Sequence, residues 1–384
     1  MTGPVVVICA RAPPQIGGTG TVMYELLRHF PKESVVLISR AQRKGISKDD
    51  RVLNVRTFEI GKVSSFVYVA VYRLVLLPLL VLEMARSLKR VPTKPGSVLV
   101  VHPDLDFLLA GIFVSKLMSL PLFVYLHDCI VENATRAFEK TAASIAQRFV
   151  FGHAKKVYAM SVPMERYYRD RNLKTEALPH GVDASLIRQV EQRRCQGKPK
   201  VGIAGVVYET NGSAIKDLVE AKKASGDSFQ ICLATSRQSL SFLRRLGIAD
   251  ALDEVHTFPS HSATLDFLSS CDILFVPMSF ESPVYKDLLT IFPTKVTDYW
   301  LAQRPILVYG PKEYAFVSLA ERDGYAKVVS SRGSEGLVRA VEESCGDIAQ
   351  RVALVRGSRK MIEQHDGTVL AHRLMADLGI PEEA

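Results

Sequence analysis

Short apolar runs rich in β-branched residues alternate with amphipathic segments along most of the chain. Such runs predict buried parallel strands, and segments with helical apolar periodicity predict helices packed on them. The predicted strands are Val5–Cys9, Val35–Ser39, Val98–Val101, Leu122–Leu126, Lys156–Met160, Val201–Gly205, Gln230–Ala234, Val255–Phe258, Ile273–Pro277, Ile306–Tyr309 and Ala326–Ser330. The predicted helices are Thr21–Phe30, Leu105–Met118, Arg136–Gly152, Ala214–Ala224, Ala263–Ser270, Thr294–Ala302 and Glu335–Glu343. The alternation indicates an α/β fold with helices on both faces of parallel sheets.

The alternation pauses at Gln189–Lys198, a polar stretch without apolar periodicity. We therefore predict two Rossmann-like domains, residues 1–188 and residues 199–364, joined by a linker at 189–198. Residues 365–384 are expected to form a C-terminal helix that packs back on the first domain. At roughly 150 residues per domain, the 384 residues fit two domains. Ligands of open parallel sheets bind at the carboxyl ends of strands, so we expect loops of both domains to face a central cleft.

One stretch, Phe66–Leu82, is almost wholly apolar, but Arg73 and Pro78 interrupt it. A mid-helix arginine disfavours insertion into a bilayer, so the stretch does not predict a spanning helix. Two interpretations stay open, a helix buried against a sheet and a helix lying partly in a membrane interface. The second is favoured by the basic flank Arg86, Lys89, Arg90 and Lys94, which anionic headgroups would attract.

Charge divides unevenly along the chain. Residues 1–180 hold 25 Lys and Arg against 14 Asp and Glu, whereas residues 181–384 hold 24 against 26. The basic half predicts an anionic partner, and because no nucleic-acid-binding motif accompanies it, we expect an anionic membrane surface and no nucleic acid. The six scattered cysteines form no C-x-x-C pair, which disfavours a zinc module or a disulfide framework. The start MTGPVVVICARAPP lacks secretion-signal features, so we expect a cytoplasmic protein, peripheral on the inner membrane face.

Two loops in the first half have residues suited to ligand binding. The loop Arg11–Gly20 (RAPPQIGGTG) precedes a helix, and its glycines let backbone amides approach an anion at the helix N-terminus. A flexible turn would explain it equally well. His127 and Asp128 follow the strand Leu122–Leu126, where a histidine can bind substrate hydroxyls or phosphate and the aspartate can fix its tautomer. A purely structural His–Asp pair is the alternative.

Two further segments frame the predicted linker. In Pro179–Asp183 (PHGVD), Gly181 permits a left-handed turn and Asp183 can cap the residues after it, although a plain boundary turn is as good an interpretation. In Val201–Ser213 (VGIAGVVYETNGS), a strand runs into Gly205, then a loop, then a helix. This arrangement repeats the predicted phosphate-binding geometry in the second domain.

The segment Phe292–Pro305 (FPTKVTDYWLAQRP) has the most specific pattern. Thr294 is predicted to cap a helix, with Lys295 in its first turn, where a cation is unfavourable unless an anion binds there. Asp298 lies one turn further on roughly the same face. Phosphates on Lys295 and the amides, with ribose hydroxyls on Asp298, would hold a nucleoside diphosphate without a metal. A solvated helix start is the alternative.

Together these segments, GGTGT, LHD, PHGVD, G-x-x-Y-x-x-N-G and PTKVTDYWLAQRPILVYG, resemble the GT-B glycosyltransferases and, within them, glycosyltransferase family 4. The resemblance implies a GT-B fold whose first domain holds the acceptor and whose second holds a nucleotide sugar, with transfer that retains the anomeric configuration. It places Gly18 and Thr19 near the donor phosphates, His127 beside the reacting sugar and Asp298 on the ribose. Three positions differ from the family pattern. Thr290 stands where the family has its first acid, and Glu281 is a candidate substitute for that acid. Val206 and Asn211 stand where the family has two cations, and Lys295 and Arg11 are the candidates to replace them.

The sequence therefore predicts a glycosyltransferase that moves a sugar from a nucleoside-diphosphate sugar to a hydroxyl of a glycan, lipid-linked or small-molecule acceptor. We expect no cofactor and no essential metal, because the nearest Asp-x-Asp, Asp104–Asp106, begins a helix. A sugar-nucleotide 2-epimerase and a catalytically silent binding subunit are the alternatives. The candidate residues are His127 and Asp128 for catalysis, Arg11 and Glu132 on the acceptor side, and, for the donor, Gly17, Gly18, Thr19, Gly205, Glu281, Thr294, Lys295 and Asp298.

Overall fold

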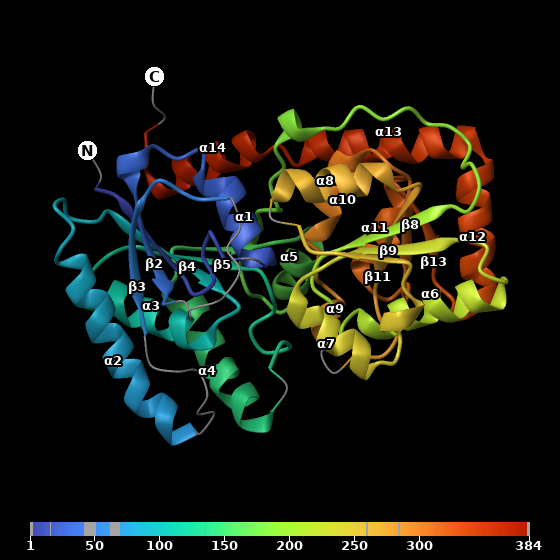
Figure 1. Cartoon of the computed structure of the whole chain (residues 1–384). Coiled ribbons are helices and arrows are strands. Elements are labelled where there is room, and N and C mark those ends of the chain that lie inside the picture. Colours follow the sequence, from blue (N-terminus) through green and yellow to red (C-terminus); the bar gives the residue numbers. More distant parts are fainter. Residues whose placement is uncertain are drawn as a thin grey trace. The chain divides into compact units, whose positions relative to one another are not determined.

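The computed structural model describes residues 3–15, 17–41, 51–61, 70–134, 136–258, 260–282 and 285–381. The chain forms two compact units, coloured mainly blue to green and yellow to red in Figure 1. Unit 1 consists of Met1–Gly181, Thr290–Phe292 and Gly367–Ala384, and unit 2 of Val182–Leu289 and Pro293–Asp366.

Unit 1 is built on a parallel seven-stranded sheet of order β3-β2-β1-β4-β5-β6-β7. The inner strands match the apolar runs of the sequence, because a strand covered on both faces must be apolar throughout. The two strands that the sequence did not predict, β3 and β7, lie at the edges of the sheet, and β3 is largely exposed. The strands are β1 Val5–Cys9, β2 Val35–Arg40, β3 Arg56–Ile60, β4 Ser97–His102, β5 Leu122–Leu126, β6 Lys156–Ala159 and β7 Glu176–Ala177.

Helices cover both faces of this sheet (Figure 1). Side chains of β1 and β4 alternate between two cores: Val6 and Val100 pack with α2, α3 and α4, and Val7 and Val101 pack with α1 and α14. The helices of unit 1 are α1 Gly18–Leu27, α2 Ala70–Leu88, α3 Leu105–Leu117, α4 Ala137–His153, α5 Val162–Arg169 and α14 Gly367–Leu378.

The apolar stretch at 66–82 contributes to α2, which contains Pro78 and continues to Leu88, whereas residues 66–69 lie outside the described residues. Its second half is two-sided: Met84 and Leu88 are buried in the core, while Leu79 and Leu82 are exposed. Within the described ranges, no helix is long and apolar enough to cross a bilayer.

Unit 2 has a parallel six-stranded sheet of order β10-β9-β8-β11-β12-β13. Its strands are β8 Lys200–Ala204, β9 Gln230–Ala234, β10 Glu254–His256, β11 Ile273–Pro277, β12 Ile306–Tyr309 and β13 Ala326–Val329. Its helices are α6 Gly212–Ala224, α7 Arg237–Arg245, α8 His261–Ser270, α9 Tyr285–Leu288, α10 Lys295–Ala302, α11 Ala315–Arg322, α12 Ser334–Gly346 and α13 Ile348–Gln364. Every strand that the sequence predicted in this half is present within two residues of its predicted ends.

The predicted linker segment forms neither helix nor strand. It lies along unit 2, because Gln192 Nε2 donates to the carbonyl of Gln303 at 2.9 Å and the amide of Cys195 to the carbonyl of Cys345 at 3.3 Å. The last part of the chain is α14, which packs in unit 1. There Asp377 pairs with Lys156 at 2.6 Å and accepts a hydrogen bond from Tyr158 at 2.7 Å.

Candidate functional site

The glycine loop of unit 1 joins β1 to the N-terminus of α1. Gly17 is the N-cap residue, with φ 145°, a backbone conformation that is nearly restricted to glycine. Gly20 is needed for a different reason, since a Cβ there would lie 2.4 Å from the carbonyl oxygen of Gln15. The helix begins at Gly18, three residues before the predicted start, so the amides of Gly18 and Thr19 belong to its first turn and suit an anion.

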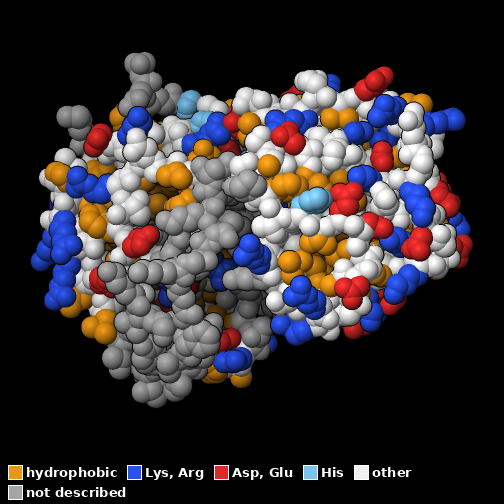
Figure 2. Space-filling view, in the orientation of Figure 1, with side chains coloured by type: hydrophobic (Ala, Val, Ile, Leu, Met, Phe, Trp, Pro, Cys, Tyr) orange, Lys and Arg blue, Asp and Glu red, His pale blue; other side chains and the backbone are white. Residues whose placement is uncertain are grey.

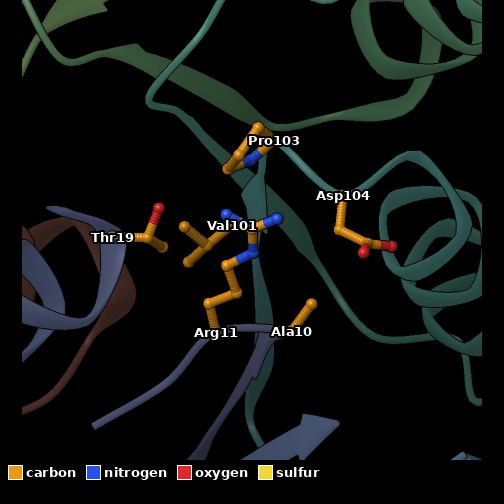
Figure 3. Close-up of a pocket in the computed structure, with 6 residues that line it drawn as sticks. All are labelled: Ala10, Arg11, Thr19, Val101, Pro103 and Asp104. Atoms are coloured by element: carbon orange, nitrogen blue, oxygen red, sulfur yellow. The ribbon is translucent and has the colours of Figure 1, made fainter. Parts of the chain in front are cut away.

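Beside this turn is a small pocket of about 40 Å³. In Figure 3 the guanidinium of Arg11 lies between Thr19, from α1, and Asp104, at the start of α3. Asp104 is already engaged: it accepts a hydrogen bond from the Phe107 amide at 3.1 Å as the N-cap of α3 and pairs with Arg40 at 2.7 Å. Asp104 is therefore a helix cap, and Arg11 is the cation of this pocket.

Three buried histidines, His102, His127 and His180, are close enough for their charges to interact. His102 ends β4, and His127 directly follows the neighbouring strand β5. Burial, with smaller contributions from His180 and His102, lowers the pKa of His127 to about 3. Burial likewise lowers the pKa of His102 to about 4. Both rings are therefore neutral at pH 7.

Within the described ranges, neither ring nitrogen of His102 or of His127 has a hydrogen-bond partner. Leaving buried polar atoms unpaired costs about 1–3 kcal/mol for each group, so the two rings are well suited to bind polar groups of a ligand. The sequence suggested that Asp128 fixes the tautomer of His127, but Asp128 makes no hydrogen bond to that ring. The ring of Tyr125 packs against His127, at 4.4 Å between ring centroids.

The two acidic candidates of unit 1 differ in environment. Burial raises the pKa of Asp128 to about 6, against the opposing effect of Arg11. The carboxylate also accepts a long hydrogen bond of 3.4 Å from Asn133. Glu132 accepts a hydrogen bond from the hydroxyl of Tyr167. Asp128 is thus poised to exchange a proton near neutral pH, whereas Glu132 is engaged in a contact within unit 1.

Thr290, which stands at the position of the family's first acid, belongs to unit 1 although its sequence neighbours belong to unit 2. Its hydroxyl lies 3.2 Å from the Cys129 sulfur, and its carbonyl accepts a hydrogen bond from Ser161 at 2.7 Å. The residue is buried next to the His127–Asp128 segment.

In unit 2, Gly205 and Lys295 lie side by side. Gly205 has φ 107°, and a Cβ built there would lie 3.9 Å from Cε of Lys295. Lys295 is the first residue of α10, as predicted, and Thr294 is the N-cap residue, although its side chain makes no capping hydrogen bond. Tyr299 ties α10 to the sheet: its hydroxyl accepts from the Ala204 amide at 2.8 Å and donates to the Phe275 carbonyl at 3.2 Å.

Lys295 is a half-buried cation, and among the described residues it has no ion-pair partner. Burial lowers its pKa from 10.5 to about 8. A desolvated ammonium group at a helix N-terminus is unfavourable both because of burial and because of the helix dipole. An anion bound there would relieve both effects, so the arrangement is suited to a phosphate.

Asp298, one turn further along α10, is held by a histidine. Nε2 of His261 lies 2.8 Å from Oδ1 of Asp298, and both side chains are largely covered. His261 is the first residue of α8, whose N-cap Ser260 accepts a hydrogen bond from the Ala263 amide at 3.2 Å. The capped helix therefore fixes the histidine, and the histidine fixes the carboxylate.

Glu281 lies in the loop after β11. Its exposed carboxylate pairs with Arg332 at 3.3 Å, and Arg332 also lies 3.4 Å from Asp217. Asn211, at one of the family's usual cation positions, braces the loop after β8: its side chain accepts from the Tyr208 amide and donates to the Val206 carbonyl, both at 3.0 Å. The asparagine therefore shapes this loop from within.

The PHGVD segment differs from the prediction in one respect. The expected left-handed turn at Gly181 is wrong, because Gly181 is not among the residues of positive φ. The glycine is needed because a Cβ would lie 2.8 Å from Cα of Gly367, where α14 begins. Asp183 does cap the short 3₁₀ turn Ala184–Leu186, accepting from the Ser185 amide at 2.9 Å.

Four residues of these clusters, His102, His180, His261 and Tyr299, were not predicted from the sequence. His102 carries the same signal as His127, a histidine at the carboxyl end of an apolar strand, and could have been found by it. The other three are brought to their clusters by tertiary packing, which no local pattern reveals.

The model of Glycosyltransferase Family 4 matches residues 16–186. The fold is shared with sucrose-phosphate synthase from Thermosynechococcus elongatus (TM-score 0.71, 14% identity, covering 97% of this chain and 98% of that one). It is also shared with Anabaena Alr3699/HepE in complex with UDP-glucose (TM-score 0.72, 13% identity, 98% and 99% covered). A third similar structure is the lipopolysaccharide outer core galactosyltransferase WaaB (TM-score 0.61, 15% identity, 97% and 98% covered). No curated protein sequence matches the chain.

The family match covers the glycine loop, the His127–Asp128 segment and PHGVD, and the two parallel α/β units correspond to the folds of the three solved structures. Residues 16–186 therefore match glycosyltransferase family 4, and the chain as a whole has the GT-B fold.

Proposed function

We propose that this protein transfers a sugar from a nucleoside-diphosphate sugar to a hydroxyl group of an acceptor, with retention of configuration and without an essential metal. The observation that carries the proposal is Lys295, a half-buried cation at the start of α10 beside Gly205, with no ion-pair partner among the described residues. A diphosphate is the ligand that would satisfy it. HepE was solved with UDP-glucose, so a uridine diphosphate sugar is the first donor to test.

In unit 2, negative charge that develops on the leaving diphosphate would be stabilised by Lys295 and by the amides at the α10 N-terminus. Thr294 and Gly205 would contribute backbone contacts, and Asp298 would accept hydrogen bonds from the ribose. Glu281, in the loop after β11, would contact the donor. Lys295 and the helix amides would thus stabilise the charge on the diphosphate, as a divalent cation does in metal-dependent transferases.

In unit 1, the neutral ring of His127 would bind a hydroxyl of the reacting sugar, and Gly17, Gly18 and Thr19 would present the α1 amides to the donor phosphates. Asp128, with a pKa near 6, would accept the proton of the attacking hydroxyl at neutral pH. Arg11 and Glu132 are assigned to the acceptor, Arg11 through the pocket that it shares with Thr19.

The acceptor is proposed to be a glycan or a lipid-linked molecule at an anionic membrane surface. The layer formed by α2, α3 and α4 exposes large apolar side chains together with basic ones, and Lys116 lies 5.4 Å from the Phe149 ring, joining α3 to α4. Lys and Arg side chains also gather near the end of α2 (Figure 2). The apolar members are Leu79, Leu82, Phe113, Leu117, Ile145 and Phe149, and the basic ones Arg86, Lys89, Arg90, Lys116 and Arg148.

Calorimetry with UDP, GDP and ADP tests the donor site. Lys295→Ala is expected to weaken binding of the preferred diphosphate by roughly tenfold or more, since a charge-assisted contact contributes about 1.5–3 kcal/mol. Lys216→Ala is the matched control, because Lys216 is an exposed lysine on α6 paired with Glu220. Equal affinity in wild type and Lys295→Ala would refute the assignment.

An assay of the reaction tests the chemistry. Transfer should continue in EDTA, and the anomeric proton of the product should show the configuration of the donor by NMR. Turnover of the nucleotide sugar without an acceptor and without release of diphosphate would instead indicate the 2-epimerase.

A further inference from the structure

Two cysteines lie side by side in unit 2, away from the residues assigned to the donor. Cys195 is half-buried in the segment without helix or strand that precedes β8, and Cys345 is buried near the end of α12. The amide of Cys195 donates a hydrogen bond to the carbonyl of Cys345 at 3.3 Å, and both side chains are free thiols. A backbone contact this close suits the Cα separation of about 4.4–6.8 Å that a disulfide requires.

A buried arginine holds its guanidinium against one of the two thiols. Nη1 of Arg351 lies 3.6 Å from the Cys195 sulfur and donates to the Ser344 carbonyl at 2.8 Å, while Nη2 donates to the Asp272 carbonyl at 3.1 Å. Arg351 is fully buried, so these bonds fix the guanidinium in place. A fixed cation beside a partly exposed thiol stabilises the thiolate, which is the nucleophilic form of cysteine.

The hydrogen-bonding pattern distinguishes the two sulfurs. The hydrogen bond with the Cys345 thiol lowers the pKa of Cys195, and Arg351 adds to this effect against burial and Asp272. The same bond, with burial, raises the pKa of Cys345. Cys195 is therefore the thiol that reacts first, and Cys345 is the neighbour that can resolve the product.

We propose that Cys195 and Cys345 form a redox modification site, which a peroxide converts reversibly to a disulfide. The Cys195 thiolate attacks one peroxide oxygen, the O–O bond breaks, and a sulfenic acid and hydroxide form. The Cys345 sulfur then attacks the Cys195 sulfur and displaces the hydroxyl group, which leaves as water with the thiol proton. A dithiol reductant returns both thiols. The disulfide would tether the segment before β8 to α12.

The pair contrasts with three other cysteines, Cys9, Cys232 and Cys271. Burial raises the pKa of Cys9 and of Cys271 to about 12, and that of Cys232 to about 11. These thiols are inert toward peroxide at neutral pH because so little thiolate is present. The modification is therefore expected to favour Cys195 over these three thiols.

Peptide mapping of the full chain after treatment with hydrogen peroxide tests the proposal. The wild type should yield a linked peptide containing Cys195 and Cys345, lighter than the two free peptides by two hydrogen atoms and released by dithiothreitol. In Cys345→Ser, dimedone present during oxidation should label Cys195. In Cys195→Ser, Cys345 should stay unlabelled, and Cys232→Ser should behave as the wild type.

Two results would overturn the proposal. One is oxidation of another cysteine by peroxide in the wild type while Cys195 and Cys345 remain free thiols. The other is equal labelling of Cys345 with and without Cys195. Far-ultraviolet circular dichroism of each serine variant establishes that it is folded before its labelling is compared.

Discussion

Nε2 of His261 lies 2.8 Å from Oδ1 of Asp298, joining the first turn of α8 to the first turn of α10. If Asp298 holds the ribose, as proposed, His261 is a positioning residue that orients this carboxylate. His261→Ala should weaken UDP binding about tenfold, because a hydrogen bond to a charged group contributes about 1.5–3 kcal/mol. His261→Gln, whose amide can still donate, should recover much of the affinity.

Calorimetry with UDP and with 2′,3′-dideoxy-UDP separates orientation from simple loss of stability. The dideoxy ligand lacks the hydroxyls that Asp298 would bind, so His261→Ala should change its affinity little. Equal weakening of both ligands by His261→Ala would show that the histidine acts only through the fold.

Replacing Lys295 by an uncharged residue should raise the stability of the unliganded fold and weaken nucleotide binding. The pKa of Lys295 is about 8 in the folded chain, against the ordinary 10.5. Below pH 8 the lysine is charged in both states, and because the folded state disfavours this charge, the charge destabilises the fold. Lys295→Met should therefore raise the unliganded stability at pH 7 by about 1–3 kcal/mol, with the gain fading between pH 8 and pH 10.5. Chemical denaturation at several pH values measures this.

The same substitution should reduce the stabilisation that UDP gives the wild type, because the variant binds UDP more weakly and a ligand stabilises only the state that it binds. A Lys295→Met variant that is less stable at pH 7 than the wild type would contradict the picture of a desolvated, unpaired ammonium group.

The strands that the sequence predicted are those buried on both faces, such as β1, β5 and β11, where packing demands unbroken apolar runs. β3 was missed because it is an edge strand with little burial, so its side chains need not be apolar. Helices α5 and α7 were missed because their apolar residues are few; α5 begins with a Ser161 cap and a proline that could have been recognised.

The candidate site was predictable only where a local pattern fixes position. The N-terminus of α10 and the glycine loop follow from local sequence, so Lys295 and Gly17 were placed correctly on their elements. The neighbours His261, His180 and Thr290 reach their clusters from segments remote in sequence. Their partners depend on how helices and loops pack, and that information is spread over the whole chain.

Asp128 predicts the acidic limb of the pH profile. Its pKa is about 6, and a base must be deprotonated to accept the acceptor's proton, so kcat/KM should rise with pH, reach half of its maximum near pH 6 and level off about one pH unit higher. His127, with a pKa of about 3, stays neutral throughout and adds no limb above pH 5. Asp128→Asn should lower kcat by about 10²–10⁴-fold and remove this limb. A residual activity that keeps the same limb in Asp128→Asn would assign it to another group.

The apolar and basic face of α2, α3 and α4 predicts binding to anionic vesicles. Leu79 and Leu117 are 54% and 66% exposed, and exposed apolar side chains that gather on one face are typical of an interaction surface. Replacing both by serine should reduce cosedimentation with phosphatidylglycerol-containing vesicles several-fold, since each buried apolar side chain contributes about 1.5–3 kcal/mol.

Lys89→Ala with Arg90→Ala should also weaken binding, and more so at low salt, because each basic residue contributes about 1 kcal/mol that salt screens. Val352→Ser with Val369→Ser is the matched control, since both valines are exposed on α13 and α14. Cosedimentation that is the same for all four proteins, or for vesicles with and without anionic lipid, would show that this face does not bind the membrane.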